Sequence, residues 1–273
     1  MSELVFLKLG GSLITDKTQP YTVRLNTLAR LAEEIKSALA RAEGLSLVLG
    51  HGSGSFGHYA VKEYMTPLPP NVLHLGGDEE GGRSFSEVWY RASQLNRYVI
   101  EALHKAEISV MSLPASALVS TLGGSITKWD LTSIKSALHA GIIPVIYGDV
   151  VFDDRMGASI LSTEHLMFYL AHHMQPQRIL LAGLEAAVWA DFPARQQRVR
   201  EVTRASYDSI SGKIGGSHGT DVTGGMKTKV EEMLLLVEDL PEMTVQVFSG
   251  EEEGNLEKVL MGEHLGTLIK SDD

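Results

Sequence analysis

The sequence predicts an α/β protein, a three-layer αβα sandwich with a mainly parallel central sheet. Apolar runs of strand length alternate with segments of helical periodicity along most of the chain, which is typical of a parallel sheet covered on both faces. Glycine follows five of the predicted strands, at Gly10, Gly50, Gly148, Gly183 and Gly250. In a parallel sheet such positions fall along one edge, where α/β proteins bind ligands. The pattern therefore predicts a site at that edge.

The first half of the chain is expected to supply four strands and four helices. The strands are the short apolar runs 4–9, 45–49, 108–113 and 142–147. The helices cover 27–42, where apolar residues recur every three or four positions, then 57–64, a long segment with apolar residues from Phe85 to Leu103, and 130–140. Prolines at 67, 69 and 70 end the second helix, and the glycine-rich segment 76–82 predicts a surface turn.

The second half continues the alternation. A helix begins at Ser162, a strand covers 179–182, and the polar segment 186–213 is irregular with possible short hairpins. The segment 221–226 opens a strong helix that runs through Val237, and strands follow at 245–248 and 267–269. No internal repeat or low-complexity linker separates these elements, so we expect residues 1–273 to form a single domain.

Composition narrows the classes of function. The 273 residues are 44% apolar and carry a formal charge of −10, which argues against nonspecific binding to nucleic acid or to an anionic membrane. Without cysteine, the chain has no disulfides, thiolate catalysis or cysteine zinc sites. The first apolar run is too short for a signal peptide and contains Lys8, and no run reaches a membrane-spanning length. We therefore expect a cytoplasmic protein.

The segment 51–58, HGSGSFGH, is the strongest candidate for a phosphate-binding loop. Its glycines let the backbone turn and present N–H groups, which form an anion-binding concavity at the start of a helix. Gly52, Gly54 and Gly57 also match the dinucleotide fingerprint, with Asp78 further on. However, the loop follows the second strand, and Asp78 lies in the glycine-rich turn. A Rossmann site is therefore disfavoured, and the P-loop, protein-kinase, HExxH and GxSxG motifs are absent from the sequence.

Four segments resemble the amino acid kinase superfamily and, within it, the isopentenyl phosphate kinases. They are LKLGGS at 7–12, with Lys17 nine residues after Lys8, the loop at 51–58, YGDVV at 147–151, and DVTGGM at 221–226, followed by Lys229. They occur in the family's order and span about residues 4 to 270. The first and last are shared across the superfamily, whereas the terminal His58 of GSFGH is the more specific feature.

This resemblance implies ATP-dependent phosphorylation of isopentenyl phosphate by in-line transfer, with Mg²⁺ and a homodimeric protein. An acceptor-binding lobe would cover about residues 1–175 and a nucleotide-binding lobe about 176–273. Because the second pKa of a phosphate is near 6, the acceptor is already an oxyanion at neutral pH, and cations and N–H donors are needed rather than a base.

The resemblance also assigns roles. The predicted catalytic residues are Lys8, Lys17, His58 and Lys229, with the lysines contacting the ATP phosphates and the transferred group. Amide donors to the phosphates would be Gly10, Gly11, Ser12 and Gly54, and the acceptor phosphate would meet His58, Ser53, Gly54 and Thr163. The nucleotide would also contact Asp221, Thr223, Gly224 and Gly225. A prenyl tail needs an apolar pocket, for which Phe85, Val88 and Trp89 are the candidates.

Two departures from the family pattern keep alternatives open. The segment Gly183–Val188 lacks both aspartates that the family carries after this strand, and Thr163 and Glu164 stand where a glycine and an aspartate are usual. Both changes allow an altered nucleotide or acceptor preference. The alternatives are a related kinase of small phosphates or phosphonates, similar to fosfomycin kinases, and a non-catalytic nucleotide-binding storage or regulatory protein of the same fold.

Other polar residues are expected to have structural roles or none. His51 follows a strand directly and is more readily a structural residue than a ligand contact, and the pair His172-His173 is expected at a solvated helix end. Asp149, Glu164 and Asp221 are candidate positions for Mg²⁺. We assign no metal ligand, because magnesium keeps water and binds mainly through substrate phosphates.

Overall fold

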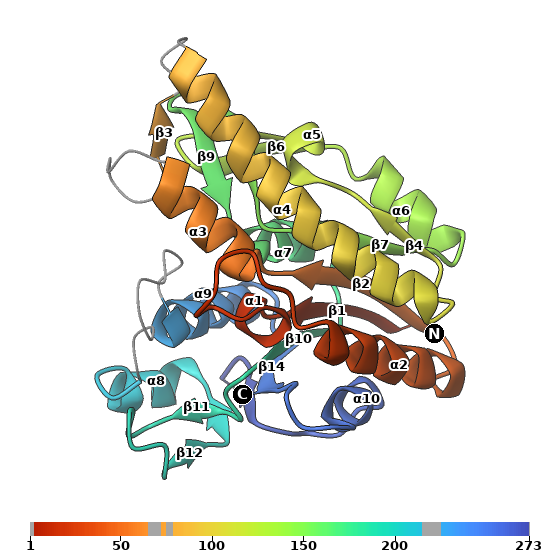
Figure 1. Cartoon of the computed structure of the whole chain (residues 1–273). Coiled ribbons are helices and arrows are strands. Elements are labelled where there is room, and N and C mark those ends of the chain that lie inside the picture. The colour runs from red at the N-terminus through yellow and green to blue at the C-terminus, as the bar shows by residue number, and fades with distance from the viewer. Residues whose placement is uncertain (1–2, 65–71, 75–78, 215–224, 273) are drawn as a thin grey trace.

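The computed structural model describes residues 3–64, 72–74, 79–214 and 225–272. A large sheet crosses the middle of the molecule with helices on both of its faces (Figure 1). Every neighbouring pair in this sheet is parallel except β14 and β15. In spatial order its strands are β13 (Glu201–Val202), β15 (Thr267–Ile269), β14 (Thr244–Ser249), β10 (Arg178–Gly183), β1 (Glu3–Leu9), β2 (Leu45–His51), β7 (Ile143–Tyr147) and β4 (Val110–Ser112).

Two hydrophobic cores form, one on each face of this sheet. Side chains alternate along β1, so Val5, Leu7 and Leu9 enter one core while Phe6 enters the other. The first core is covered by α2 (Leu25–Arg41), the carboxyl-terminal half of α4 (Glu79–Lys105) and α10 (Asn255–Leu260). The second is covered by α6 (Thr132–His139), α7 (Thr163–Met174), α8 (Arg204–Ile210) and α9 (Gly225–Asp239). This arrangement confirms the predicted three-layer α/β fold.

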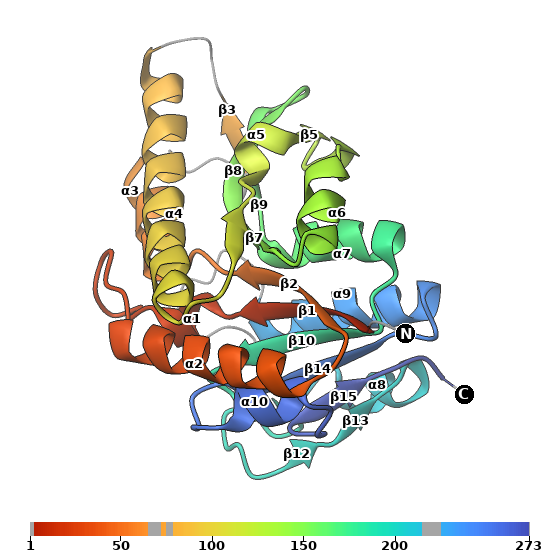
Figure 2. The ribbon, with the colours of Figure 1, turned by 90° about the vertical axis from the view of Figure 1, so that its right-hand side faces the viewer.

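A second sheet, which the sequence did not indicate, stands above one edge of the first (Figure 2). Its strands, in spatial order, are β3 (Val72–His74), β9 (Gly157–Leu161), β8 (Asp149–Asp153), β5 (Val119–Leu122) and β6 (Ser125–Trp129). All pairs are antiparallel except β5 with β8. It packs against α3 (Gly54–Tyr64), the amino-terminal half of α4, and α5 (Ala115–Leu118).

Several smaller elements also differ from expectation. Residues 79–82, predicted as part of a turn, begin α4, and residues 75–78 lie outside the described part of the chain. The predicted irregular segment contains a short hairpin of β11 (Val188–Trp189) and β12 (Arg198–Val199) and then α8. Neither α10 nor the one-turn helix α1 (Gly11–Ile14) was predicted. Within the described residues, no helix has the length and apolar character needed to cross a membrane.

Candidate active site

A cleft of about 640 Å³ opens at the carboxyl ends of the central parallel strands. Gly10, Gly148 and Gly183, three of the five strand-terminal glycines, line it directly. Gly50 does not, because it packs under α7, where a Cβ atom would lie 2.6 Å from a methyl carbon of Thr163. The cleft thus lies at the sheet edge that the sequence predicted, between the large sheet and the second sheet.

The amino-terminal ends of four helices meet at this cleft. It is lined by Gly11 and Ser12 of α1, Gly54 of α3, Thr163 of α7 and Gly225 of α9. The first N–H groups of a helix have no acceptor within the helix, and the helix dipole favours anions at that end. Helix starts that converge in this way provide N–H donors for phosphate oxygens. The predicted phosphate-binding segments, 7–12 and 51–58, are therefore brought together.

Two of the predicted lysines share one carboxylate. Lys8 lies in β1, and its Nζ is 2.6 Å from Oε1 of Glu164 in the first turn of α7. Nζ of Lys229, in the first turn and a half of α9, is 3.7 Å from the same oxygen. Lys8 and Glu164 are only 7% and 5% exposed, so each would be costly to bury alone. Glu164 therefore joins the two lysines from opposite ends of the chain.

Glu164 remains ionised because of these lysines. Burial raises the pKa of its carboxyl, but Lys8 and Lys229 outweigh that effect and hold the pKa near 2. The carboxylate is then charged throughout the neutral range. It fixes both ammonium groups in the cleft, where they can neutralise the charge of a bound phosphate.

The two glycine loops interlock through their backbones. A Cβ atom on Gly11 would lie 2.4 Å from the amide nitrogen of Gly54, and one on Gly52 would lie 2.8 Å from the amide nitrogen of Gly11. Gly54 also has φ of +53°, a conformation that suits glycine. The loops after β1 and β2 thus approach as closely as backbone permits, and this contact places their N–H groups in one concavity.

The predicted acceptor residues lie on the α3 side of the cleft. His58 and Ser53 both line it, and His58 follows one turn into α3, where its ring meets Tyr59 edge-on at 6.0 Å between centroids. The neighbouring wall is apolar. It is formed by Val61 of α3, Val88 and Ala92 of α4, and Ile160 of β9.

Phe85 and Trp89, proposed from sequence as pocket residues with Val88, do not line this cleft. Phe85 stacks on Phe152 with ring centroids 4.5 Å apart, and Trp89 is 41% exposed on the surface of α4. On a helix, residues 88 and 92 share a face, while residue 89 is rotated by about 100°. The apolar stripe of this helix could be predicted from sequence, but the part of the stripe that faces the cleft could not.

His51 and Thr163 support the floor of the site. The His51 ring is fully buried, faces the carbonyl oxygen of Gly52 and the Oδ1 of Asn96, both at 3.2 Å, and stacks on Tyr147. Thr163 donates its hydroxyl to the His51 carbonyl at 2.6 Å. Burial lowers the pKa of His51 to about 4, so the imidazole is neutral at pH 7. His51 is therefore a structural residue, as the sequence suggested.

The opposite end of the cleft is aromatic and apolar. It is lined by Leu184, Trp189, Phe192, Ile214, Met226 and Val247. Glu185, in the segment that lacks the family's two aspartates, accepts hydrogen bonds from the Arg195 guanidinium and from Nε1 of Trp189. Of the predicted nucleotide contacts, Gly225 lines the cleft, whereas Asp221, Thr223 and Gly224 lie outside the described residues.

The remaining predicted lysine, Lys17, is exposed on the loop between α1 and α2. It lines the cleft together with Asp16 and Thr18. Asp16 accepts hydrogen bonds from the backbone N–H and the hydroxyl of Thr18, at 2.8 and 2.7 Å, which shape the tip of this loop. Lys17 is thus brought to the same cleft as Lys8 and Lys229.

The carboxylates that line the described part of the cleft are already engaged. Asp16 is bonded to Thr18, Asp149 to the N–H groups of Val150 and Ser116, Glu164 to the two lysines, and Glu185 to Arg195. Among described residues, no group of three or more His, Asp or Glu side chains forms a metal cage.

Sequence reasoning missed Glu164 as the partner of Lys8, and it missed Arg24 and Thr15, which also line the cleft. A signal for Glu164 existed. A charged lysine within an apolar strand is costly to bury without a partner, and Glu164 stands two residues after Ser162, which caps α7. For Arg24 the sequence contains no comparable signal.

Comparisons of the sequence and the structure with known proteins agree on one family. The model of the amino acid kinase family matches residues 3–249. The isopentenyl phosphate kinase of Methanocaldococcus jannaschii is 31% identical over 270 residues, covering 97% of this chain and 98% of the relative. That of Methanothermobacter thermautotrophicus is 33% identical over 281 residues, with the same coverage. A solved isopentenyl phosphate kinase superposes with a TM-score of 0.80 at 29% identity, over 97% of this chain and 100% of that structure.

Proposed function

Because this chain belongs to the amino acid kinase family, we propose that it is a kinase that transfers the γ-phosphoryl group of ATP to isopentenyl phosphate. The product is isopentenyl diphosphate. The observation that carries this assignment is a single cleft in which the Lys8–Glu164–Lys229 cluster and four helix starts lie between an apolar wall on α3 and α4 and an aromatic end at Trp189 and Phe192. Two isopentenyl phosphate kinases, 31% and 33% identical to this chain, match it over nearly their full lengths.

The chemistry of two phosphates matches the centre of the cleft. Both reactants are anions, so transfer requires that they be held in line and that their mutual repulsion be neutralised. We assign this work to Lys8, Lys17 and Lys229, with N–H groups of Gly10, Gly11, Ser12 and Gly54 as further donors. The acceptor oxygen is already ionised near neutral pH, which makes a carboxylate base unnecessary. Glu164 then acts on the lysines and not on the substrate.

The acceptor is assigned to the α3 side of the cleft. His58 and Ser53 would hold its phosphate beside the start of α3, and Thr163 would contribute through the loop it supports. The five-carbon tail would lie on the apolar wall formed by Val61, Val88, Ala92 and Ile160. These residues line the same cleft as His58. Phe85 and Trp89 have no part in this proposal.

ATP is assigned to the opposite side. Its base would lie against the aromatic end of the cleft, and its triphosphate would reach the start of α9 at Gly225. The contacts that the family resemblance assigns to Asp221, Thr223 and Gly224 stay predictions, because these residues lie outside the described part of the chain. Magnesium would arrive on the phosphates and neutralise part of their charge. With this placement, the proposed acceptor lobe covers about residues 1–175 and the proposed nucleotide lobe about 176–273.

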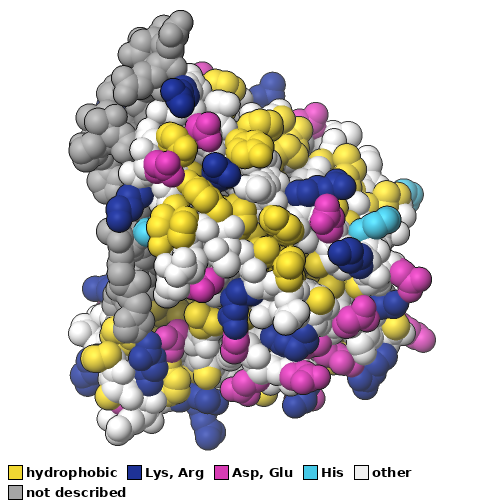
Figure 3. Space-filling model, viewed as in Figure 1, with side chains coloured by type: hydrophobic (Ala, Val, Ile, Leu, Met, Phe, Trp, Pro, Cys, Tyr) yellow, Lys and Arg dark blue, Asp and Glu magenta, His cyan; other side chains and the backbone are white. Residues whose placement is uncertain are grey.

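We also propose that the protein is a homodimer. β4 is an edge strand of the large sheet and pairs only with β7 among the described strands. Apolar side chains gather over α4 on the face shown in Figure 3, and Trp89, Tyr90 and Met111 are each more than 40% exposed. Apolar side chains that are exposed together on one face favour an interface. A cytoplasmic location also remains a prediction.

Release of ADP tests the function. Purified protein with Mg·ATP is offered isopentenyl phosphate, dimethylallyl phosphate, fosfomycin, glutamate or no acceptor. We expect turnover with the two prenyl phosphates alone. Preference for fosfomycin would indicate the related phosphonate kinase. Nucleotide binding without turnover on any acceptor would refute the assignment and favour a storage or regulatory protein.

A further inference from the structure

The loop that carries Lys17 has a well-defined base. Residues 15–23 leave α1 and return to α2, with Thr15 and Val23 forming a β-bridge. The N–H of Asp16 donates to the carbonyl of Thr22 at 2.9 Å, and the N–H of Arg24 donates to the carbonyl of Ile14 at 2.9 Å. The loop is therefore a narrow hairpin whose tip lies at the cleft and whose two ends meet at Arg24.

The Arg24 side chain fastens this base to a distant part of the chain. Its two terminal nitrogens contact the two carboxylate oxygens of Glu251 at 2.7 and 2.5 Å, and Nη1 also donates to the carbonyl of Leu13 in α1 at 3.1 Å. A bidentate guanidinium–carboxylate pair fixes direction as well as distance. Arg24 therefore joins α1, the hairpin and the segment after β14 in one contact.

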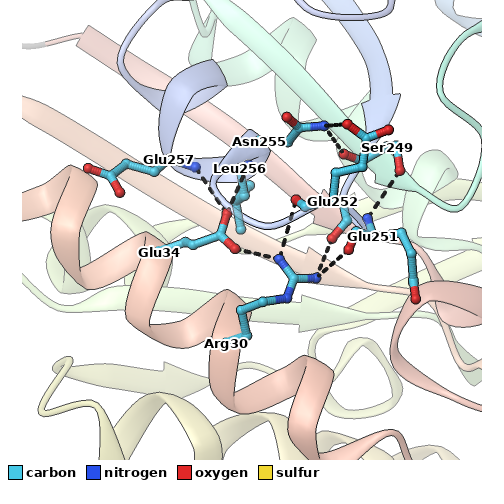
Figure 4. Close-up of polar contacts among 9 residues, drawn as sticks. Arg30, Glu34, Ser249, Glu251, Glu252, Asn255, Leu256 and Glu257 are labelled. Atoms are coloured by element: carbon cyan, nitrogen blue, oxygen red, sulfur yellow. Dashed lines mark hydrogen bonds and ion pairs between the residues drawn. The ribbon is translucent and has the colours of Figure 1, made fainter.

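The segment that contains Glu251 is itself fixed to α2. Arg30 donates to the carbonyls of Gly250 and Glu251 at 2.6 and 3.3 Å, and its guanidinium also pairs with Glu34 (Figure 4). Glu34, which is buried, accepts from the N–H groups of Leu256 and Glu257 at 3.0 and 3.4 Å. It thereby caps α10, whose own N-cap residue, Gly254, has no side chain to do so. The backbone at Glu251 is thus fixed to α2 through Arg30.

From these contacts we propose that Arg24, held by Glu251, is a positioning residue that sets the place of Lys17 in the phosphoryl-transfer site. The inference rests on the proposed function for Lys17 and extends it. Lys17 is exposed and sits on a loop tip, so its own side chain offers little to fix it. The base of the hairpin determines where the ammonium group lies. In a reaction that depends on alignment, a displacement of about 1 Å can cost up to 100-fold in rate.

The role predicts non-additive kinetics. In Arg24→Ala, kcat with isopentenyl phosphate should fall about tenfold, with a smaller loss in Glu251→Gln, which keeps the shape of the side chain. In a Lys17→Ala background, the same Arg24→Ala change should alter kcat by less than about twofold, since there is no ammonium group left to position.

Arg178→Ala is the matched control. Arg178 also makes a bidentate pair, with Glu3 at 2.6 and 2.8 Å, and donates to the carbonyls of Val259 and Leu260. It lies at the start of β10, at the end of the sheet remote from the cleft, so it should lower thermal stability without the Lys17-dependent loss. Amide hydrogen exchange of residues 15–24 provides a readout independent of any acceptor, and we expect faster exchange there in Arg24→Ala than in Arg178→Ala.

Each outcome decides the question. Additive losses from Arg24→Ala and Lys17→Ala would show that Arg24 contacts substrate directly and would overturn the positioning role. Unchanged exchange in residues 15–24 would overturn the anchoring itself. If the unmodified protein does not turn over isopentenyl phosphate, the proposed function fails separately, while the exchange experiment still judges the anchor.

Discussion

Replacement of Glu164 by glutamine tests the centre of the site most directly. The change keeps the shape of the side chain and removes the charge shared by Lys8 and Lys229, whose Nζ atoms lie 2.6 and 3.7 Å from Oε1. Removing one partner of a buried ion pair typically costs 3–5 kcal/mol, and we take about 3 kcal/mol because glutamine can still accept a hydrogen bond. For a chain of this size that corresponds to a fall in Tm of about 6–12 °C.

Catalysis should respond differently from nucleotide binding. Without the carboxylate, the two ammonium groups repel each other and lose their common anchor, so kcat should fall by about 100-fold. The affinity for Mg·ATP should be unchanged or higher, because a negative charge has been removed from the wall that meets the triphosphate. Steady-state ADP release and calorimetric titration with a non-hydrolysable ATP analogue measure the two effects.

The pH dependence of this difference follows from the lowered pKa of Glu164. A carboxyl whose pKa is lower in the folded state stabilises the fold above its unfolded value of about 4.5, and that contribution is lost as the pH falls toward about 2. The gap in Tm between the two proteins should therefore be constant from pH 6 to 9 and narrow below about pH 4.5. Glu232→Gln, on α9 beside His165, is the control. A Glu164→Gln variant with unchanged kcat would refute the proposed role.

His58→Ala should raise KM for isopentenyl phosphate at least tenfold with little effect on ATP binding, and equal losses of both would remove His58 from the acceptor site. Gly54→Ala should lower Tm and kcat/KM together, because its Cβ would lie 2.2 Å from Oγ1 of Thr15 at a positive φ, whereas Gly82→Ala, in open space, should not. Burial lowers the pKa of His51 to about 4. The free energy of unfolding should therefore be unaffected by this group above pH 6.5 and should fall by up to about 3 kcal/mol as the pH is lowered toward 4. Melting curves of His51→Gln between pH 7 and 5 should show a smaller loss than those of the unmodified protein.

The central strands could be predicted from sequence because each is buried on both faces and reads as a continuous apolar run. The second sheet could not, because its strands are short and their burial is mixed, as in β6, where Trp129 is buried and Ser125 is exposed. It is held by contacts distant in sequence. For example, the carboxylate of Asp153 accepts the N–H groups of Gly123 and Gly124 at 2.9 and 2.7 Å.

In the candidate site too, features set by local sequence could be predicted, and features set by contacts distant in sequence could not. Lys8 could be identified from sequence because burying a charged lysine in an apolar strand costs free energy. The glycine loops could be identified because two backbones approach this closely only where no Cβ atom is present. Their partners were harder to find. Glu164 is 156 residues from Lys8, and the phase of α4 that brings Val88 and not Trp89 to the cleft depends on which element covers each face. A sequence pattern can thus show that a buried charge requires a partner, whereas the tertiary structure shows which residue is that partner.

Glu164 and Glu251 explain how a chain of net charge −10 can be suited to two phosphates. Each carboxylate holds cationic residues in place before substrate arrives. Glu164 holds the ammonium groups of Lys8 and Lys229 in the cleft, and Glu251 holds the Arg24 guanidinium, which in turn positions Lys17. Cations that are already oriented need no rearrangement when charge develops in the transition state, and this preorganisation is a large part of electrostatic catalysis. Glu164 and Glu251 therefore favour phosphoryl transfer through the cationic residues they hold, although their own charges oppose the binding of anions.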